Sequence, residues 1–261
     1  MSLLNQVTTM PDTFVVAEGE YPPVRINIQG IDGIGKSTFG SDADGSIFIQ
    51  AEDGLGFIKN AARFPVANTW EEIRAQIAEL MNEDHQFKTV VLDTTDAAAK
   101  LAEEFVIKEN NWKSANDPKA AYGAFYVAEE NAWRHLLQGL NYCHTDRKMN
   151  VILLSHVGDK VVNDPPVGEY RAYQMRNNKK VNALIKDWVD FNLFADYDKT
   201  LASDGTAKSS GNRFLYTRYS MGFEAKSRLA IPEQLPLSWN DFITAYKKAL
   251  NPAPSTETEA A

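Results

Sequence analysis

The stretch from Gly30 to Thr38 has residue types whose spacing could bind phosphate. It reads Gly30-Ile31-Asp32-Gly33-Ile34-Gly35-Lys36-Ser37-Thr38 and matches the P-loop pattern G-x-x-x-x-G-K-[ST]. Its glycines let backbone N–H groups point at an anion, and a following helix N-terminus adds favourable partial charge. Lys36 can then reach the β- and γ-phosphates, and the Ser37 hydroxyl can ligate Mg²⁺. The stretch therefore predicts a nucleoside triphosphate site.

The segment in front of this stretch supports the prediction. Residues 24–29 alternate β-branched and polar side chains, as a strand that feeds the loop should. A glycine-rich turn that matches the pattern by chance is the alternative, and the preceding strand counts against it.

Two acidic residues follow predicted strands further along the chain. Glu52 comes after the strand at residues 46–51, and Asp93 ends the apolar strand at 87–94, in the manner of a Walker B motif. The carboxyl ends of strands are where α/β sheets place ligands. We expect Asp93 to join Ser37 in the Mg²⁺ shell. Glu52 is a candidate for a functional role, with a solvated loop acid as the alternative.

A third strand, at residues 149–154, ends beside His156 at the same expected edge. Residues 157–181 are predicted to form a long loop without regular secondary structure. The basic residues of this loop, interleaved with tyrosines, are Arg171, Arg176, Lys179 and Lys180. Cations mixed with aromatic rings suit single-stranded nucleic acid, because phosphates meet charge and bases stack. A solvated mobile loop is an equally good interpretation.

The elements that must position these residues alternate between strands and helices. Helices are predicted over residues 70–81, 96–108, 119–143 and 184–189 and after Ser238, with further strands at 190–197 and 213–219. Such alternation predicts an α/β fold with a mostly parallel central sheet flanked by helices and a β-rich C-terminal part. We divide the chain into an N-terminal arm (1–22), one ATPase domain (23–250) and a disordered acidic tail (251–261).

Composition excludes several classes of protein. The chain has 261 residues, 44% of them hydrophobic and 24% charged, which is typical of a soluble domain. It lacks an apolar run of the roughly 18 residues that a membrane helix needs, and its single cysteine, Cys143, cannot form an internal disulfide. The net charge of −8 counts against a dedicated duplex-DNA binder. We expect a cytoplasmic protein.

Several segments together resemble the RecA family, in its short phage-encoded, AAA-grouped form of the single-strand-annealing type. The segments are Phe48-Ile49-Gln50-Ala51-Glu52-Asp53-Gly54-Leu55, Val90-Val91-Leu92-Asp93 and Val151-Ile152-Leu153-Leu154-Ser155-His156. The resemblance covers about residues 24–235. It implies that Glu52 is the general base and that Lys36 and Thr38 bind phosphate. It places His156 as the γ-phosphate sensor, where RecA itself has glutamine.

The resemblance also implies ATP, Mg²⁺, single-stranded DNA and self-assembly into a ring or filament in the bacterial host. It leaves open a single-strand-binding protein as a further partner. Lys226-Ser227-Arg228 resembles the K-x-R pair that RecA/KaiC-type ATPases insert into a neighbouring subunit's site. Surface charge is the alternative for Lys226 and Arg228.

Two other functions fit parts of the sequence. Gly30-Ile31-Asp32-Gly33 also resembles the P-loop of thymidylate kinases, but here only a short helix precedes the next strand and no arginine-bearing substrate motif follows. A nucleotide-gated DNA-binding or loader protein with little turnover is the second alternative. The presence of both Glu52 and Asp93 favours hydrolysis over that alternative.

Overall fold

A large sheet organises the protein in the computed structural model, which describes residues 21–59 and 61–251. The strands run in the order β12-β10-β7-β1-β5-β4-β2-β3, with β6 paired to β5 and β11 paired to β7. Their bounds are β1 Arg25–Gly30, β2 Ser46–Gln50, β3 Ala62–Arg63, β4 Thr89–Asp93, β5 Asn150–Asp164, β6 Gly168–Met175, β7 Phe191–Tyr197, β10 Arg213–Tyr216, β11 Lys226–Ser227 and β12 Gln234–Pro236. The strands from β7 to β3 are parallel, whereas β6, β10, β11 and β12 pair antiparallel. The predicted fold class is confirmed.

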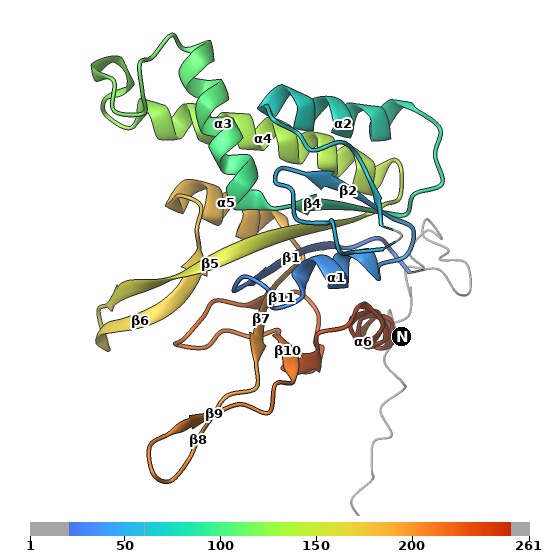
Figure 1. Ribbon diagram of the computed structural model, residues 1–261, viewed down its shortest axis with the longest axis vertical. Coiled ribbons are helices and arrows are strands. Elements are labelled where there is room, and N and C mark those ends of the chain that lie inside the picture. Colours follow the sequence, from blue (N-terminus) through green and yellow to red (C-terminus); the bar gives the residue numbers. More distant parts are fainter. Residues whose placement is uncertain (1–20, 60, 252–261) are drawn as a thin grey trace, which may run out of the picture.

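Helices cover both faces of this sheet (Figure 1). They are α1 Lys36–Ser41, α2 Trp70–Asn82, α3 Thr95–Glu109, α4 Ala124–Thr145, α5 Lys179–Trp188 and α6 Trp239–Leu250, with a short 3-10 helix at Pro118–Ala120. Helices α2 to α5 pack on one face and α1 and α6 on the other. Successive strand residues alternate between the two cores, so that Val90 and Leu92 face α2 to α5 while Val91 faces α1.

The start of α2 shows how local sequence sets these elements. The Thr69 hydroxyl accepts a hydrogen bond from the Glu72 N–H at 3.2 Å, which is one half of a capping box. The Glu72 carboxylate reaches one residue further back than expected and accepts from the Asn68 N–H at 2.6 Å. The helix is then fixed to α4 by its first residue, because Trp70 packs against Trp133 with ring centroids 5.4 Å apart.

The prediction of a structureless loop over residues 157–181 is wrong. Strand β5 continues to Asp164 and pairs with β6 in an unbroken antiparallel hairpin, and α5 begins at Lys179, well before residue 184. Pro165 and Pro166 lie in the turn of the hairpin, and β6 begins directly after the turn at Gly168, whose φ is 92°. Figure 1 shows the hairpin projecting from the body of the protein. Helix α4 also begins later than predicted, at Ala124 rather than residue 119.

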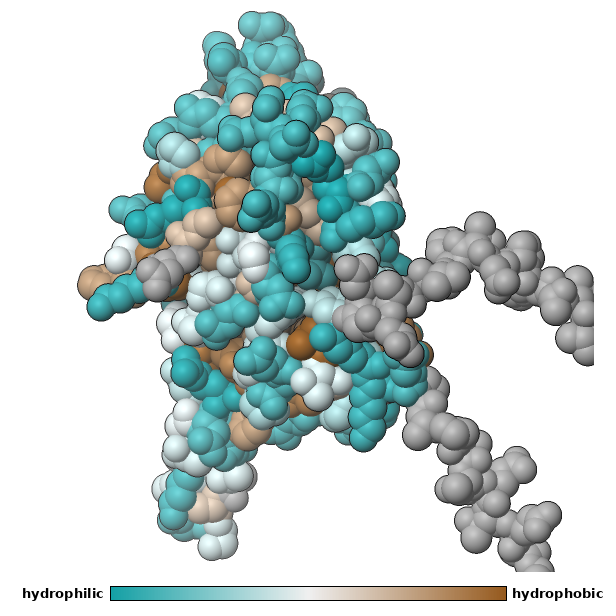
Figure 2. Space-filling view, turned by 90° about the vertical axis from the view of Figure 1, so that its right-hand side faces the viewer, coloured by the Kyte–Doolittle hydropathy of each residue, from teal (hydrophilic) through white to brown (hydrophobic). Residues whose placement is uncertain are grey.

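A small second hairpin forms around the turn at Asp204-Gly205. It consists of β8 (Thr200–Leu201) and β9 (Ala207–Lys208), and it protrudes at the lower end of the protein in Figures 1 and 2. The face in Figure 2 is mostly hydrophilic, with apolar residues in small separate patches. No helix within residues 21–59 and 61–251 is long and apolar enough to cross a membrane. The predicted arm and tail lie outside the described residues, apart from positions 21, 22 and 251.

Candidate nucleotide-binding site

The register of the parallel strands brings the predicted site residues together at the carboxyl ends of the strands. Gly30, at the end of β1, pairs with His156 on β5, and Asp93, at the end of β4, pairs with Gln50 at the end of β2. Glu52 follows β2 by two residues. The P-loop, both acids and the histidine therefore meet at the carboxyl ends of the strands.

The P-loop has the backbone conformation that its glycines allow. Gly33 and Gly35 have φ values of 74° and 111°, which other residues rarely adopt. Helix α1 begins directly afterwards at Lys36, whose buried ammonium donates to the carbonyls of Gly30 at 3.1 Å and Ile31 at 2.9 Å. Burial lowers the pKa of Lys36 to about 8, with nearby acids opposing the shift. A phosphate bound here would supply the negative charge that this buried cation lacks.

Ser37 and Asp93 form the predicted cation-binding pair. The Ser37 hydroxyl donates to Oδ2 of Asp93 at 2.8 Å. Burial raises the pKa of Asp93, and the hydrogen bond from Ser37 opposes the shift. Hydroxyl and carboxylate oxygens are the hard donors that Mg²⁺ prefers, so the pair fits the ion that the P-loop pattern implies.

Glu52 lies beside this pair and is positioned by Thr94, the residue after Asp93. The Thr94 hydroxyl donates to Oε1 of Glu52 at 2.8 Å, and Nδ1 of His156 lies 4.0 Å from the same oxygen. The Glu52 side chain is 43% exposed. The carboxylate is thus held at the site by a hydrogen bond and is accessible to water.

His156 links the P-loop to α3 and to the hairpin β5–β6. Its Nδ1 lies 3.1 Å from Asp96 and its Nε2 lies 3.0 Å from Asp32 in the P-loop. Arg176, directly after β6, also donates to Asp32 at 3.0 Å. Burial alone would raise the pKa of Asp96, but hydrogen bonds from the ring and backbone of His156 lower it to about 2.

Sequence reasoning missed the roles of Asp96 and Arg213. Asp96 lies in the first turn of α3, three residues after Asp93, and that closeness was the available signal. Arg213, on β10, donates to the Ile34 carbonyl at 3.2 Å, and a Cβ placed on Gly35 would lie 2.7 Å from its guanidinium. No local pattern marks Arg213, because the contact depends on the pairing of β10 with β7.

The four predicted DNA-binding residues are distributed over three elements. Arg171 lies on β6 and pairs with Asp159 across the hairpin, whereas Arg176 turns to the P-loop. Lys179 and Lys180 begin α5, where Lys180 lies 3.5 Å from Glu130. Only Arg171 is on the projecting part of the hairpin.

Lys226 and Arg228 lie toward the other end of the strands from the P-loop of their own chain. Lys226 pairs with Asn192 near the start of β7, at the edge of the sheet opposite Gly30. Its ammonium donates to the backbone carbonyl of Lys186, and burial lowers its pKa. Arg228 forms an ion pair with Asp190 at 2.9 Å.

Three comparisons with known proteins found similar sequences or structures. A family model described as AAA domain (AAA_24) matches residues 22–229. The SPbeta prophage-derived uncharacterized protein YorG of Bacillus subtilis (strain 168) is 25% identical over 187 residues, covering 69% of this chain and 56% of that protein. The chain thus spans about half the length of this curated relative. The crystal structure of the RadB recombinase aligns with a TM-score of 0.44 at 14% identity, covering 84% of this chain and 90% of that one.

Proposed function

Because the chain belongs to the AAA domain family, we propose that it is a phage-type, RecA-like ATPase that binds single-stranded DNA and acts in recombination or annealing in the cytoplasm of a bacterial host. The observation that carries the proposal is the 2.8 Å hydrogen bond between Ser37 of the P-loop and Asp93 of β4, with Glu52 and His156 beside it. These groups form a constellation suited to phosphoryl transfer to water.

In the proposed reaction Glu52 acts as general base. Its carboxylate, held by Thr94, orients a water molecule and accepts its proton as the water oxygen bonds to the γ-phosphorus of ATP. The bond between that phosphorus and the β–γ bridging oxygen breaks, and ADP leaves. Lys36 exchanges its bonds to backbone carbonyls for bonds to the phosphates and stabilises the negative charge that develops there. When bound, Mg²⁺ would supply Lewis-acid stabilisation of phosphate oxygens, and Ser37 and Asp93 would hold it.

Self-assembly is part of the proposal. Lys226 and Arg228 lie toward the opposite end of the strands from the P-loop, which supports a role at a neighbouring subunit's nucleotide and not at their own. Such a cation supplied by a neighbour can accelerate phosphoryl transfer by roughly 10³- to 10⁵-fold. This arrangement supports hydrolysis at subunit interfaces of a ring or filament.

The hairpin β5–β6 is the proposed link between ATP and DNA. Its base carries His156 and Arg176, which both contact Asp32 in the P-loop, and its arm carries Arg171. A γ-phosphate next to Lys36 would compete with the Asp32 carboxylate for the Arg176 guanidinium and for the contact with the His156 ring, and the hairpin would respond at its base. Arg171, Lys179 and Lys180 are proposed to contact DNA phosphates.

The experiment that tests the proposal is ATP hydrolysis by the full chain with and without a single-stranded oligonucleotide. We expect DNA to stimulate turnover, and Lys36→Ala to remove basal and stimulated turnover alike. Turnover that ignores DNA would remove the recombination role and leave an ATPase with another client. Transfer of phosphate to a nucleoside monophosphate, with no release of free phosphate, would instead establish a kinase.

A further inference from the structure

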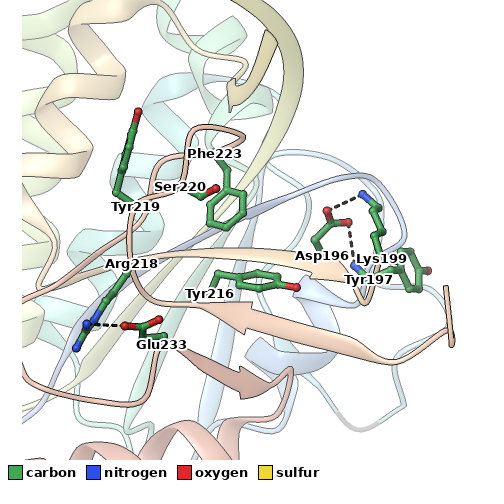
Figure 3. A pocket seen from close by; sticks show the side chains of 9 residues that line it. All are labelled: Asp196, Tyr197, Lys199, Tyr216, Arg218, Tyr219, Ser220, Phe223 and Glu233. Atoms are coloured by element: carbon green, nitrogen blue, oxygen red, sulfur yellow. Dashed lines mark hydrogen bonds and ion pairs between the residues drawn. The ribbon is translucent and has the colours of Figure 1, made fainter. Parts of the chain in front are cut away.

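A cavity lies on the face of the sheet opposite α1. It has a volume of about 370 Å³ and is lined by Tyr216, Phe223, Asp196, Lys199, Arg218 and Glu233, among others (Figure 3). Leu193 and Ala195 of β7 pack into the core under α1 and α6. Asp196 therefore projects from the other face, because strand residues alternate. The cavity is separate from the phosphate site, although both lie at the carboxyl end of β7.

The floor of this cavity is aromatic. Phe223 stacks on the buried ring of Phe194, with centroids 4.2 Å apart and planes 9° from parallel. Tyr216 lies against Phe223 with centroids 5.1 Å apart. A planar group entering the cavity would meet aromatic rings backed by a packed core.

The rim of the cavity carries two ion pairs, one on each side in Figure 3. Lys199 contacts Asp196 at 2.6 Å, and Arg218 contacts Glu233 at 2.6 Å. The rim thus offers both hydrogen-bond donors and acceptors, and its formal charges balance. Balanced charge favours a neutral ring with a hydrogen-bonding edge over an isolated polyanion. A nucleobase has both properties.

The cavity is joined to the hairpin β5–β6. The Tyr173 N–H of β6 donates to the Gly222 carbonyl at 2.8 Å, and the hydroxyls of Tyr170 and Tyr219 are 3.2 Å apart. Arg171 is two residues before Tyr173 on β6, so these two side chains share a face of the hairpin. A single strand of DNA whose phosphates contacted Arg171 would therefore pass the opening of the cavity.

We propose that this cavity holds a nucleobase of single-stranded DNA, stacked on Phe223 while the backbone passes along the hairpin. The inference rests on the proposed function and adds the place where the DNA is held. Stacking on an aromatic ring is tolerant of sequence, since every base has a π-face. The site would therefore supply affinity without sequence preference.

The test compares two oligonucleotides of equal length, dT₂₀ and an abasic strand, by fluorescence anisotropy in the presence of Mg²⁺ and a non-hydrolysable ATP analogue. Phe223→Leu keeps apolar contact with Phe194 but removes the ring. Tyr219→Ala removes a side chain that is 61% exposed at the cavity, so it should not disturb folding. We expect each variant to weaken dT₂₀ binding by about tenfold and to leave abasic binding unchanged.

Controls separate the failure of this inference from failure of the proposed function. Tyr126→Ala, at a half-exposed tyrosine on α4, should bind both strands like the wild type. Wild-type binding to neither strand would defeat the DNA-binding role itself. Normal binding of both strands by both cavity variants would overturn only the cavity assignment, as would an equal loss on both strands. Binding of free dTMP that depends on Phe223, without any oligonucleotide effect, would assign the cavity to a mononucleotide instead.

Discussion

The guanidinium of Arg176 donates to the carboxylate of Asp32 at 3.0 Å, joining the base of the hairpin β5–β6 to the P-loop across 144 positions of sequence. Both side chains are about half exposed, at 45% and 64%. Exposed pairs of this kind contribute less than about 1 kcal/mol to stability. The contact is therefore of more interest for its position, next to Lys36, than for holding the fold together.

Replacing Arg176 tests that position. If the γ-phosphate takes Arg176 from Asp32, Arg176→Gln should lower kcat/KM for ATP by about tenfold to a hundredfold, the range for a lost hydrogen bond to a charged group. The melting temperature should hardly change. Arg171→Gln is the matched control, because Arg171 pairs with Asp159 within the hairpin. If both variants have the same kcat/KM for ATP in the absence of DNA, Arg176 does not contact the nucleotide.

Glu52→Gln should reduce hydrolysis by about 10²- to 10⁴-fold, the contribution of a general base. The amide can still accept from Thr94, so binding of a fluorescent ATP analogue should be retained. Asp53→Asn changes the adjacent exposed acid and should hydrolyse ATP normally. If Asp53→Asn loses hydrolysis and Glu52→Gln retains it, the general base is the next residue along the chain, Asp53, and not Glu52.

Asp93→Asn should separate stability from function. The buried carboxylate has a raised pKa, so its charged form opposes folding at neutral pH, and the neutral amide removes that charge. The variant without nucleotide should melt at the same temperature as the wild type or higher. It should lose the extra stabilisation that Mg²⁺ with ADP gives the wild type in differential scanning calorimetry. Full retention of that increment would exclude Asp93 from the metal site.

Glu129 on α4 makes stability depend on pH. Burial, with a smaller effect of Glu103, raises its pKa from 4.5 to about 7, although Asn178 donates to it at 2.6 Å. The Glu129 carboxyl group therefore stays protonated in the folded protein at pH values at which it is ionised in the unfolded chain. The contribution of Glu129 to the free energy of unfolding is fully present below about pH 4.5, and it is lost as the pH rises through 7. Glu129→Gln should therefore be more stable than the wild type above pH 7, by up to about 3 kcal/mol.

Urea titrations at pH 5 and pH 8 measure this difference. The gap in unfolding free energy between the variant and the wild type should be small at pH 5 and large at pH 8. Glu130→Gln, at a partly buried acid paired with Arg134, provides the control and should show no such trend. If the difference in unfolding free energy between Glu129→Gln and the wild type is the same at both pH values, Glu129 is not the source of the pH dependence.

Mixing two inactive variants tests the role of Lys226 and Arg228. A Lys226→Ala, Arg228→Ala double variant should retain its P-loop but lack the cations, whereas Lys36→Ala retains the cations but lacks the phosphate ligand. Random co-assembly leaves about a quarter of subunit interfaces with both intact parts. We expect the mixture to recover about that fraction of wild-type turnover. Activity of the double variant on its own would show that these residues only hold the fold through Asp190.

The parts of the site that could be predicted from sequence are those built from local contacts. The P-loop and the acid at the end of β4 need only a strand, a turn and the start of a helix, and their residue types reflect this directly. Asp32 with Arg176 and Ile34 with Arg213 are joined across 144 and 179 positions. Such contacts depend on which strands pair, and no short pattern carries that information.

The hairpin shows a different limit of sequence reasoning. Its two arms face solvent on much of their surface, so the apolar alternation that marks a half-buried strand is weak. Pro165 and Pro166 mark a turn in either interpretation. The backbone pairing between the arms, and not burial, makes residues 157–175 regular.

The hairpin β5–β6 also has the dimensions of a lever. Its eight paired positions run from Val157 with Met175 to Asp164 with Gly168, and seven steps of about 3.4 Å per residue give an arm of roughly 24 Å. Its pivot is anchored, since Asn177, just after the hairpin, donates to Thr95 at the start of α3. A rotation of about 10° at the pivot would move the tip by roughly 4 to 5 Å, about the separation of neighbouring strands. An ångström-scale change at Asp32 would thus be magnified several-fold at the far end of the arm.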